Sequence, residues 1–115
     1  MTVTIWHNPK CSTSRKVLGI IRARGIEPKI VDYVNAPPSV AAHKAALKAL
    51  GMKPRDLLRK RGTPYDELGL DDKTLSDIAL IEAMHVHPIL IERPVVQSSK
   101  GTRLCRPPEM VEELL

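Results

Sequence analysis

The amino-acid sequence predicts an α/β fold, in which a βαβ unit near the start and a ββα unit near the end share one mixed β-sheet, with a helical insertion between them. Short segments rich in β-branched residues occur near the two ends of the chain, and the first leads directly into a helical pattern. From about residue 39 to about residue 87 the chain carries mainly helical spacing and turn residues. Its 115 residues are enough for a single core without disulfides or metals, so we expect one domain over residues 1–115.

The N-terminal unit is predicted from an alternating segment, a helix and a second strand. Residues 2–6 alternate between apolar and polar side chains, as a half-buried strand does. Residues 12–24 carry apolar side chains at helical spacing, and Gly25 is the expected C-terminal stop. Residues 29–34 then form a second strand, which returns beside the first through a right-handed crossover.

The insertion is predicted to hold three helical segments and one ordered loop, namely helices at residues 40–50, 54–60 and 76–86 and a loop at residues 61–72. Ser39 caps the first of these helices and Gly51 closes it. The last helix should turn Ile78 and Ile81 inward. It ends at His87, because the residue before a proline is pushed out of the helical region.

The last third of the chain returns to strands. Its apolar, β-branched segments are expected to be strands at residues 89–92, 95–98 and 102–105. The sequence Pro-Pro-Glu at residues 107–109 opens a terminal helix, since proline is tolerated in the first turn, and Met110, Val111 and Leu114 would pack on the sheet. This order, β-α-β, a helical insertion and then β-β-α, is that of a thioredoxin-like fold with extra helices between its halves.

Composition narrows the function classes. The chain has 18 Lys and Arg against 13 Asp and Glu, a net charge of +5, which suits a nucleic acid, an anionic surface or a small anionic substrate. With no Phe, one Trp and two Tyr it offers little for stacking on bases, so we favour the small anion. Neither a membrane-spanning stretch nor a secretory signal is evident. We therefore expect a cytoplasmic protein without membrane or nucleic-acid partners, whose two cysteines are reduced.

Cys11 is the strongest candidate for a reactive group. It stands in the run HNPKCSTSR, between the first strand and the first helix. Backbone N–H groups and the positive end of the helix dipole converge there and favour a thiolate over a thiol. The residues that follow offer further donors to an anion: Ser12, Thr13, Ser14, Arg15 and Lys16. The alternative is an inert buried cysteine, and the polar, turn-forming neighbours argue against it.

Four separated motifs resemble those of the glutaredoxin-linked arsenate reductases. They are HNPKCSTSR, LLRK at residues 57–60, ERPVV at residues 92–96 and GTRLCRP at residues 101–107, in the same order as in that family. Members of the family have a thioredoxin-like fold and reduce arsenate to arsenite with glutathione and glutaredoxin. The resemblance therefore implies an arsenate reductase whose partners are arsenate, glutathione and glutaredoxin.

The same resemblance implies roles for individual residues. Cys11 becomes the nucleophile, and three arginines bind the oxyanion: Arg59, Arg93 and Arg106. His7 and Ser14 match polar positions around the thiol, and Pro94 matches a cis-proline that follows an active-site arginine. Arginine also suits arsenate on chemical grounds, because its planar fork of N–H groups matches paired oxygens of a tetrahedral anion and stays charged. The other arginines considered, which we expect at the surface, are Arg55, Arg61 and Arg103.

The expected reaction starts with attack of the Cys11 thiolate on arsenic, loss of water and formation of a covalent thiol–arsenate adduct. Ser14 stands where a CxxC motif has its second cysteine, which points to an external thiol. The resemblance implies glutathione as this co-substrate, followed by glutaredoxin, and no bound cofactor. Cys105 is either a packed thiol or an internal resolving cysteine, and His7 is either a charged donor to the thiolate or a residue that orients the loop. No metal site is expected, because the histidines and cysteines form no zinc-type pattern.

Two other functions stay open from the sequence. A non-enzymatic regulator of the Spx type shares the fold and would contact RNA polymerase through a basic surface, although its redox-switched members use a CxxC motif that is absent here. A thiol oxidoreductase of the same fold acting on another substrate is the second. A phosphatase-type arsenate reductase is disfavoured, because Arg15 follows Cys11 too closely for its oxyanion loop.

Overall fold

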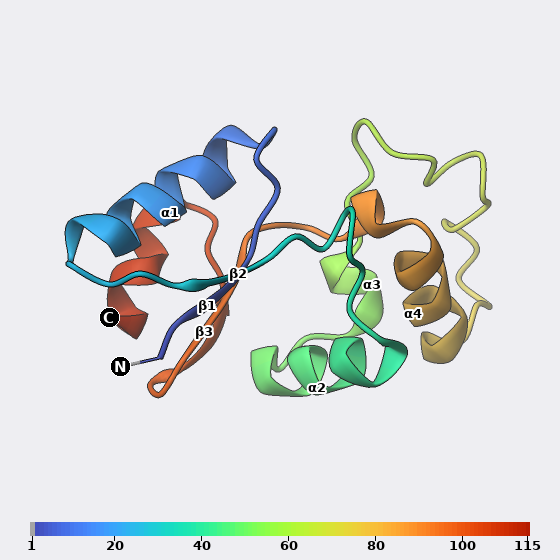
Figure 1. The fold of residues 1–115 in the computed structure, drawn as a ribbon. Helices are drawn as coiled ribbons and strands as arrows, with labels where there is room; N and C mark the ends of the chain where they lie inside the picture. Colours follow the sequence, from blue (N-terminus) through green and yellow to red (C-terminus); the bar gives the residue numbers. More distant parts are fainter. Residues whose placement is uncertain (1) are drawn as a thin grey trace. The chain divides into compact units, whose positions relative to one another are not determined.

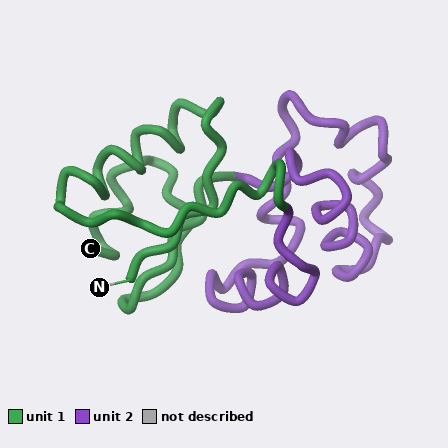
Figure 2. Tube along the Cα trace, in the orientation of Figure 1, with its two compact units in different colours: residues 1–36, 93–115 green, residues 37–92 purple. Residues whose placement is uncertain are grey.

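The computed structural model describes residues 2–115 and divides into two compact units (Figure 2). The sheet unit comprises the residues up to 36 together with residues 93–115, and the helical unit comprises residues 37–92. The helical unit takes in the stretch that the sequence analysis treats as an insertion. The assignment of residues 1–115 to one domain stays a prediction.

The sheet unit contains a mixed four-stranded sheet in the order β2-β1-β3-β4. The strands are β1 (Thr4–Trp6), β2 (Lys29–Val31), β3 (Val95–Ser98) and β4 (Gly101–Leu104). β1 pairs parallel with β2 and antiparallel with β3, so that Ile5 lies opposite Ile30 on one side and Val96 on the other. β3 and β4 pair antiparallel. This arrangement confirms the predicted thioredoxin-like α/β fold.

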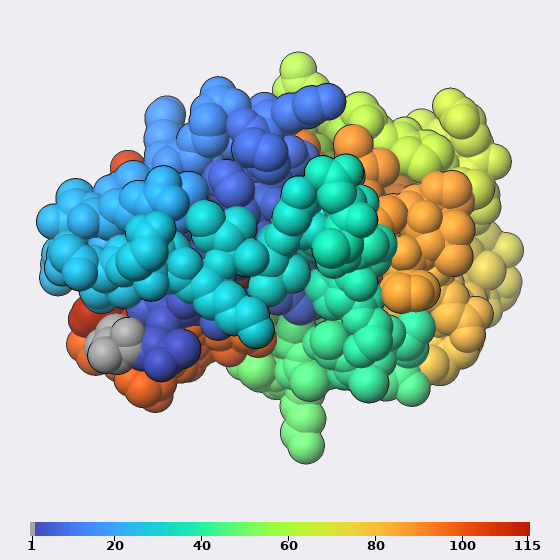
Figure 3. Space-filling model, in the orientation of Figure 1, coloured from blue at the N-terminus to red at the C-terminus, as the bar shows by residue number. Residues whose placement is uncertain are grey.

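Two helices complete the sheet unit. α1 (Ser12–Ala23) packs beside η2 (Pro108–Leu114), a 3-10 helix at the C-terminus (Figure 1). On the face shown in Figure 3, α1 and the segment that follows it cover much of the sheet unit. The buried residues that form its hydrophobic core are Val3, Ile5, Val17, Leu18, Ile21, Val96, Cys105, Val111 and Leu114. One of the two cysteines is therefore a core residue.

The helical unit consists of α2 (Val40–Leu50), α3 (Pro54–Leu57), α4 (Asp77–Val86) and the 3-10 helix η1 (Pro88–Leu90). The Ser39 hydroxyl accepts the Ala42 N–H at 3.1 Å, and the Ser76 hydroxyl accepts the Ala79 N–H at 3.2 Å, which satisfies a donor at the start of α2 and of α4. Gly51 ends α2 with a φ of 68°, in the left-handed region that glycine adopts without strain. In the described part of the chain, no helix has the length and apolar character needed to cross a membrane.

Two predictions for the helical unit are wrong. Residues 89–92 are not a strand, because the apolar run begins in η1 and then makes a single antiparallel bridge between Ile91 and Leu58. Pro88 is the first residue of η1, and proline has no N–H to donate to a strand ladder. Ile78 is 43% exposed, whereas α4 buries Leu80, Ile81 and Met84 instead.

Two further elements are shorter than predicted. β2 ends at Val31 rather than at residue 34, because Asp32 begins a turn in which its carbonyl accepts the Ala36 N–H at 2.8 Å. The Asp32 carboxylate also accepts the Asn35 N–H at 3.2 Å. The helical piece predicted for residues 54–60 ends at Leu57, where the backbone turns extended.

Candidate active site

Cys11 is the N-cap residue of α1, where the backbone is still extended, with φ −92° and ψ 121°. Its carbonyl accepts the Arg15 N–H at 3.0 Å, which closes the first turn of the helix. The Cys11 side chain is partly exposed. The thiol therefore lies at a helix N-terminus within reach of solvent, the position that the motif predicts.

Hydrogen bonds from both ends fix the loop that carries Cys11. The Asn8 carbonyl accepts the Cys11 N–H at 3.0 Å, and the Asn8 N–H donates to the fully buried Ser14 hydroxyl at 3.2 Å. From α1, the Arg15 guanidinium donates to the Pro9 carbonyl at 2.7 Å. The sequence analysis missed Asn8 and gave Arg15 to the anion. An Asn-Pro pair is a turn signal, and it was the clue to this anchoring role.

His7 lies beneath this loop and is 8% exposed. Its Nδ1 lies 2.5 Å from the Ser14 hydroxyl oxygen. Burial, followed by the positive charge of Arg22, holds the pKa of His7 below its ordinary value. Because the Ser14 oxygen already accepts from the Asn8 N–H, its own proton is available to Nδ1 of a neutral ring. This geometry favours the orienting role for His7 over that of a charged donor.

Arg93 is the cation that acts directly on the Cys11 thiol. It is 8% exposed, and its side chain hydrogen-bonds to the thiol. Burial of the sulfur opposes ionisation, but the backbone N–H of Ser14, the hydrogen bond and charge of Arg93, and the backbone N–H of Thr13 outweigh it. The pKa of Cys11 is therefore lowered.

Arg106 and Pro94 lie next to Arg93 in the sheet unit. Arg106 is exposed, and its Nη1 donates to the Arg93 carbonyl at 2.9 Å. The Arg93–Pro94 bond is cis, as the family resemblance implies, and so is the Arg106–Pro107 bond, which the sequence analysis did not single out. Cys11, Arg93, Pro94 and Arg106 thus belong to one unit, although they come from both ends of the sequence.

Arg59 belongs to the helical unit. It directly follows the bridging residue Leu58, and its N–H donates to the Leu90 carbonyl at 2.7 Å. Its guanidinium forms an ion pair with Glu92, with Nη1 3.1 Å from Oε1, and also donates from Nε to the Arg61 carbonyl at 3.1 Å. The ion pair with Glu92 was not foreseen from the sequence.

Cys105 has the opposite environment to Cys11. It is completely buried in the core of the sheet unit, and burial raises its pKa to about 12. A thiol with this pKa is almost entirely protonated at neutral pH and is a poor nucleophile. Of the two alternatives left open by the sequence, the geometry favours the packed thiol.

Arg55 is a structural residue rather than the surface charge that we expected. Its guanidinium donates to the Leu70 carbonyl at 2.8 Å and to the Asp72 carbonyl at 2.9 Å, which ties down the long loop before α4. The expectation was wrong because these acceptors are backbone carbonyls, which no residue pattern reveals.

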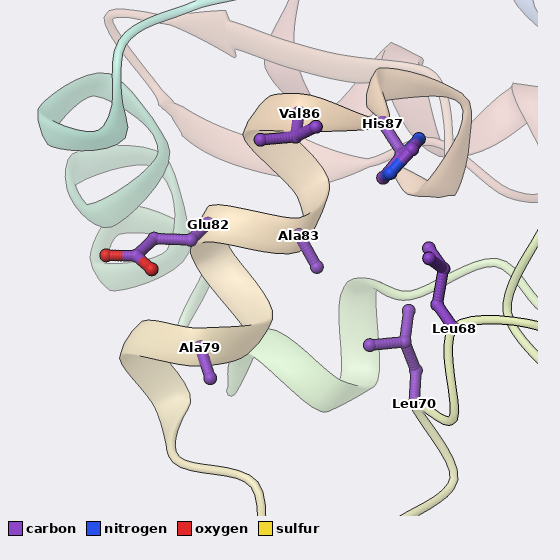
Figure 4. A pocket seen from close by; sticks show the side chains of 7 residues that line it. All are labelled: Leu68, Leu70, Ala79, Glu82, Ala83, Val86 and His87. Carbon is purple, nitrogen blue, oxygen red and sulfur yellow. The ribbon is translucent and has the colours of Figure 1, made fainter.

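A pocket of about 320 Å³ lies in the helical unit, between α4 and the loop before it (Figure 4). Ala79 and Ala83 of α4 point into it from one side, and Leu68 and Leu70 of the loop border the other. Its lining is mainly apolar, whereas Cys11 and the three arginines predicted to bind an oxyanion lie elsewhere in the chain. An apolar pocket does not suit a small multiply charged anion.

Comparisons with known proteins agree on one family. The model of the ArsC family matches residues 6–114. The arsenate reductase of Rhizobium meliloti (strain 1021) is 53% identical over 100% of this chain and 82% of its own length. The arsenate reductase of Escherichia coli (strain K12) is 48% identical over 98% of this chain and 80% of its own length. The solved structure of an arsenate reductase from Vibrio cholerae is similar with a TM-score of 0.95, at 45% identity, over 100% of this chain and 98% of that one.

Proposed function

This chain belongs to the ArsC family, and from that premise we propose that it is an arsenate reductase, an enzyme that reduces arsenate to arsenite with Cys11 as its nucleophile. The observation that carries the proposal is the partly exposed Cys11 thiol, whose pKa is lowered at a helix N-terminus beside the buried Arg93. The names of relatives that match nearly the whole chain supply the substrate.

In the first step, the sulfur of Cys11 attacks arsenic. An S–As bond forms, an As–O bond breaks, and the departing oxygen takes up protons and leaves as water. Arsenic is still As(V) in this adduct. Its reduction to As(III) needs two electrons, which two thiols supply when they end as a disulfide. The reaction therefore requires a second thiol.

We assign the second thiol to glutathione, as co-substrate, with glutaredoxin resolving the resulting mixed disulfide. Ser14 occupies the place of the second cysteine of a CxxC motif, and its hydroxyl is engaged by His7 and Asn8. Cys105 is buried with its pKa raised to about 12. Both facts support an external donor. A reaction that consumes reduced thiols suits the cytoplasm, where glutathione keeps them reduced.

The oxyanion is assigned to arginines. Arg93 and Arg106 bring two guanidinium groups to the sheet unit that carries Cys11, and their carbonyl-to-guanidinium hydrogen bond couples them. Arg59 would add a third cation from the helical unit. Guanidinium groups match arsenate because each offers two parallel N–H donors to two oxygens of one anion.

A coupled assay tests the proposal. Purified protein with arsenate, glutathione, glutaredoxin and glutathione reductase should consume NADPH, and omission of any one thiol component should stop consumption. Cys11→Ser should be inactive but folded, since a hydroxyl is a far weaker nucleophile at neutral pH and differs little in volume. Equal turnover by Cys11→Ser would remove Cys11 from the mechanism, and a wild-type protein without arsenate-dependent turnover would refute the reaction itself.

A further inference from the structure

Glu92 forms an ion pair with one of the arginines assigned to the oxyanion. Its Oε1 lies 3.1 Å from Nη1 of Arg59, and both residues belong to the helical unit. The side chains of Arg59 and Glu92 are 24% and 23% exposed. Those of the Arg103–Glu113 pair are 54% and 60% exposed. Because less water competes for the Arg59–Glu92 pair, its geometry is held more firmly than that of an exposed pair.

The backbone fixes both partners of the Arg59–Glu92 pair. The Arg59 N–H donates to the Leu90 carbonyl at 2.7 Å, and the Glu92 N–H donates to the Leu57 carbonyl at 2.8 Å. These two bonds flank an isolated β-bridge between the two segments. The carboxylate and the guanidinium therefore extend from two short segments that are joined to each other.

Glu92 engages one part of the guanidinium and leaves another part for a ligand. A guanidinium has five N–H donors in a rigid plane. In Arg59, Nε donates to the Arg61 carbonyl and Nη1 donates to Glu92, each at 3.1 Å. The Nη2 edge, with the second N–H of Nη1, keeps the forked geometry that matches two oxygens of a tetrahedral anion. Contacts on one side thus fix the direction of the other.

We propose that Glu92 is a positioning residue for the oxyanion, whose carboxylate holds the Arg59 guanidinium so that its Nη2 edge is presented to arsenate. This inference rests on the proposed function, in which Arg59 binds arsenate. Glu92 itself makes no contact with the substrate, because two anions repel each other. Its benefit is that Arg59, a long side chain, loses less rotamer freedom when arsenate binds.

Two substitutions of Glu92 separate this role from a purely structural one. In Glu92→Ala no oxygen accepts from Nη1, so KM for arsenate should rise about threefold to fivefold with kcat within about twofold of wild type, the range expected for one ion pair of this kind. In Glu92→Gln the amide oxygen still accepts, and KM should lie at or below about twice the wild-type value. Melting curves from circular dichroism check that each variant is folded.

A binding measurement makes the test independent of turnover. Arsenate is titrated calorimetrically into Cys11→Ser protein that carries the same Glu92 substitutions, and Kd should follow the order found for KM. The variants Arg59→Ala and Arg59→Ala/Glu92→Ala complete a double-mutant cycle. If Glu92 acts through Arg59, the double variant should bind arsenate no more weakly than Arg59→Ala alone.

Several results would overturn the role of Glu92: an unchanged KM and Kd in Glu92→Ala, a Glu92→Gln variant as impaired as Glu92→Ala, additive losses in the double variant, or a Kd that Arg59→Ala does not alter. Glu113→Ala breaks the exposed pair with Arg103 and is the matched control, which should leave both constants unchanged. Absence of arsenate turnover in the wild type would refute the proposed function, while the calorimetric cycle would still decide whether Glu92 positions Arg59.

Discussion

At Cys11 opposing effects act on one sulfur: burial raises the pKa, and the Ser14 N–H and the Arg93 guanidinium lower it. Because Arg93 supplies both a hydrogen bond and a charge, Arg93→Met should raise the pKa of Cys11. The pH dependence of alkylation by iodoacetamide measures this. Arg24→Met removes a charge at the other end of α1 and should leave the profile unchanged. A wild-type profile with an ordinary thiol pKa would contradict the account.

Cys105 should matter for packing and not for turnover. Cys105→Ala removes a fully buried sulfur and should lower the free energy of unfolding by roughly 1 kcal/mol, while most glutaredoxin-dependent activity remains. Chemical denaturation and the coupled assay measure the two quantities. The external-thiol mechanism fails if activity disappears in a folded variant and mass spectra of the wild type show a disulfide between Cys11 and Cys105.

The geometry of the arginines, beyond their charge, should decide arsenate use. Arg93→Lys and Arg106→Lys keep the charge but remove the forked donors, so kcat/KM for arsenate should fall at least about tenfold, which corresponds to roughly 1.4 kcal/mol. Arg61→Lys is the matched control, because the side chain of Arg61 is exposed. If all three lysine variants behave alike in the coupled assay, the forked geometry has no special part in binding.

Between α2 and α4, a buried histidine should make the helical unit sensitive to acid. His43 of α2 is 1% exposed, and its ring lies edge-on to that of His85 of α4, with centroids 6.1 Å apart. Burial and then the charge of His85 lower the pKa of His43, against a hydrogen bond to the Pro38 carbonyl that raises it. The unfolded chain therefore binds the proton more readily, so stability is full above the unfolded value near 6.5 and is lost as pH falls through the folded pKa.

The expected result is a melting temperature that decreases as pH is lowered below about 6.5, with the decrease reduced in His43→Leu. His87→Asn leaves the buried ring in place and should keep the wild-type dependence. Differential scanning calorimetry at a series of pH values gives the comparison. The same slope in His43→Leu and in the wild type would assign the acid sensitivity to other groups, such as His7, whose pKa is also lowered by burial.

At the scale of the whole molecule, the sequence predicts the fold well wherever local signals agree with the final packing. α1 follows from the apolar spacing of its residues and from Gly25, whose φ is 76°, and α2 from Ser39 and Gly51. The β-branched run at residues 89–92 misled, because Pro88 and a single bridge to Leu58 decide its conformation. Tertiary contacts of this kind leave no periodicity in the sequence.

The candidate site divides in the same way. Cys11, Ser14 and His7 are close in sequence and belong to one motif, so their proximity could be predicted. The contact of Arg93 with Cys11 joins two distant segments and entered only through the family resemblance. The Glu92 ion pair could not be predicted at all, since a glutamate before an arginine is ordinary in sequence, and its partner is set by the bridge that brings the two segments together.

The net charge of +5 should be felt by any anion that approaches Cys11. Iodoacetate and iodoacetamide alkylate the same sulfur but differ in charge, so the ratio of their rates measures the local potential without arsenate chemistry. Relative to free cysteine, this ratio should be several-fold higher at about 20 mM salt and should decrease toward the free-thiol value at about 0.5 M, where screening shortens the range of the field to about 4 Å. Cys105 is buried and should not contribute. A ratio equal to that of free cysteine, or one that salt leaves unchanged, would show that the basic residues create no attraction at the thiol, and arsenate would then have to be captured by the arginine contacts alone.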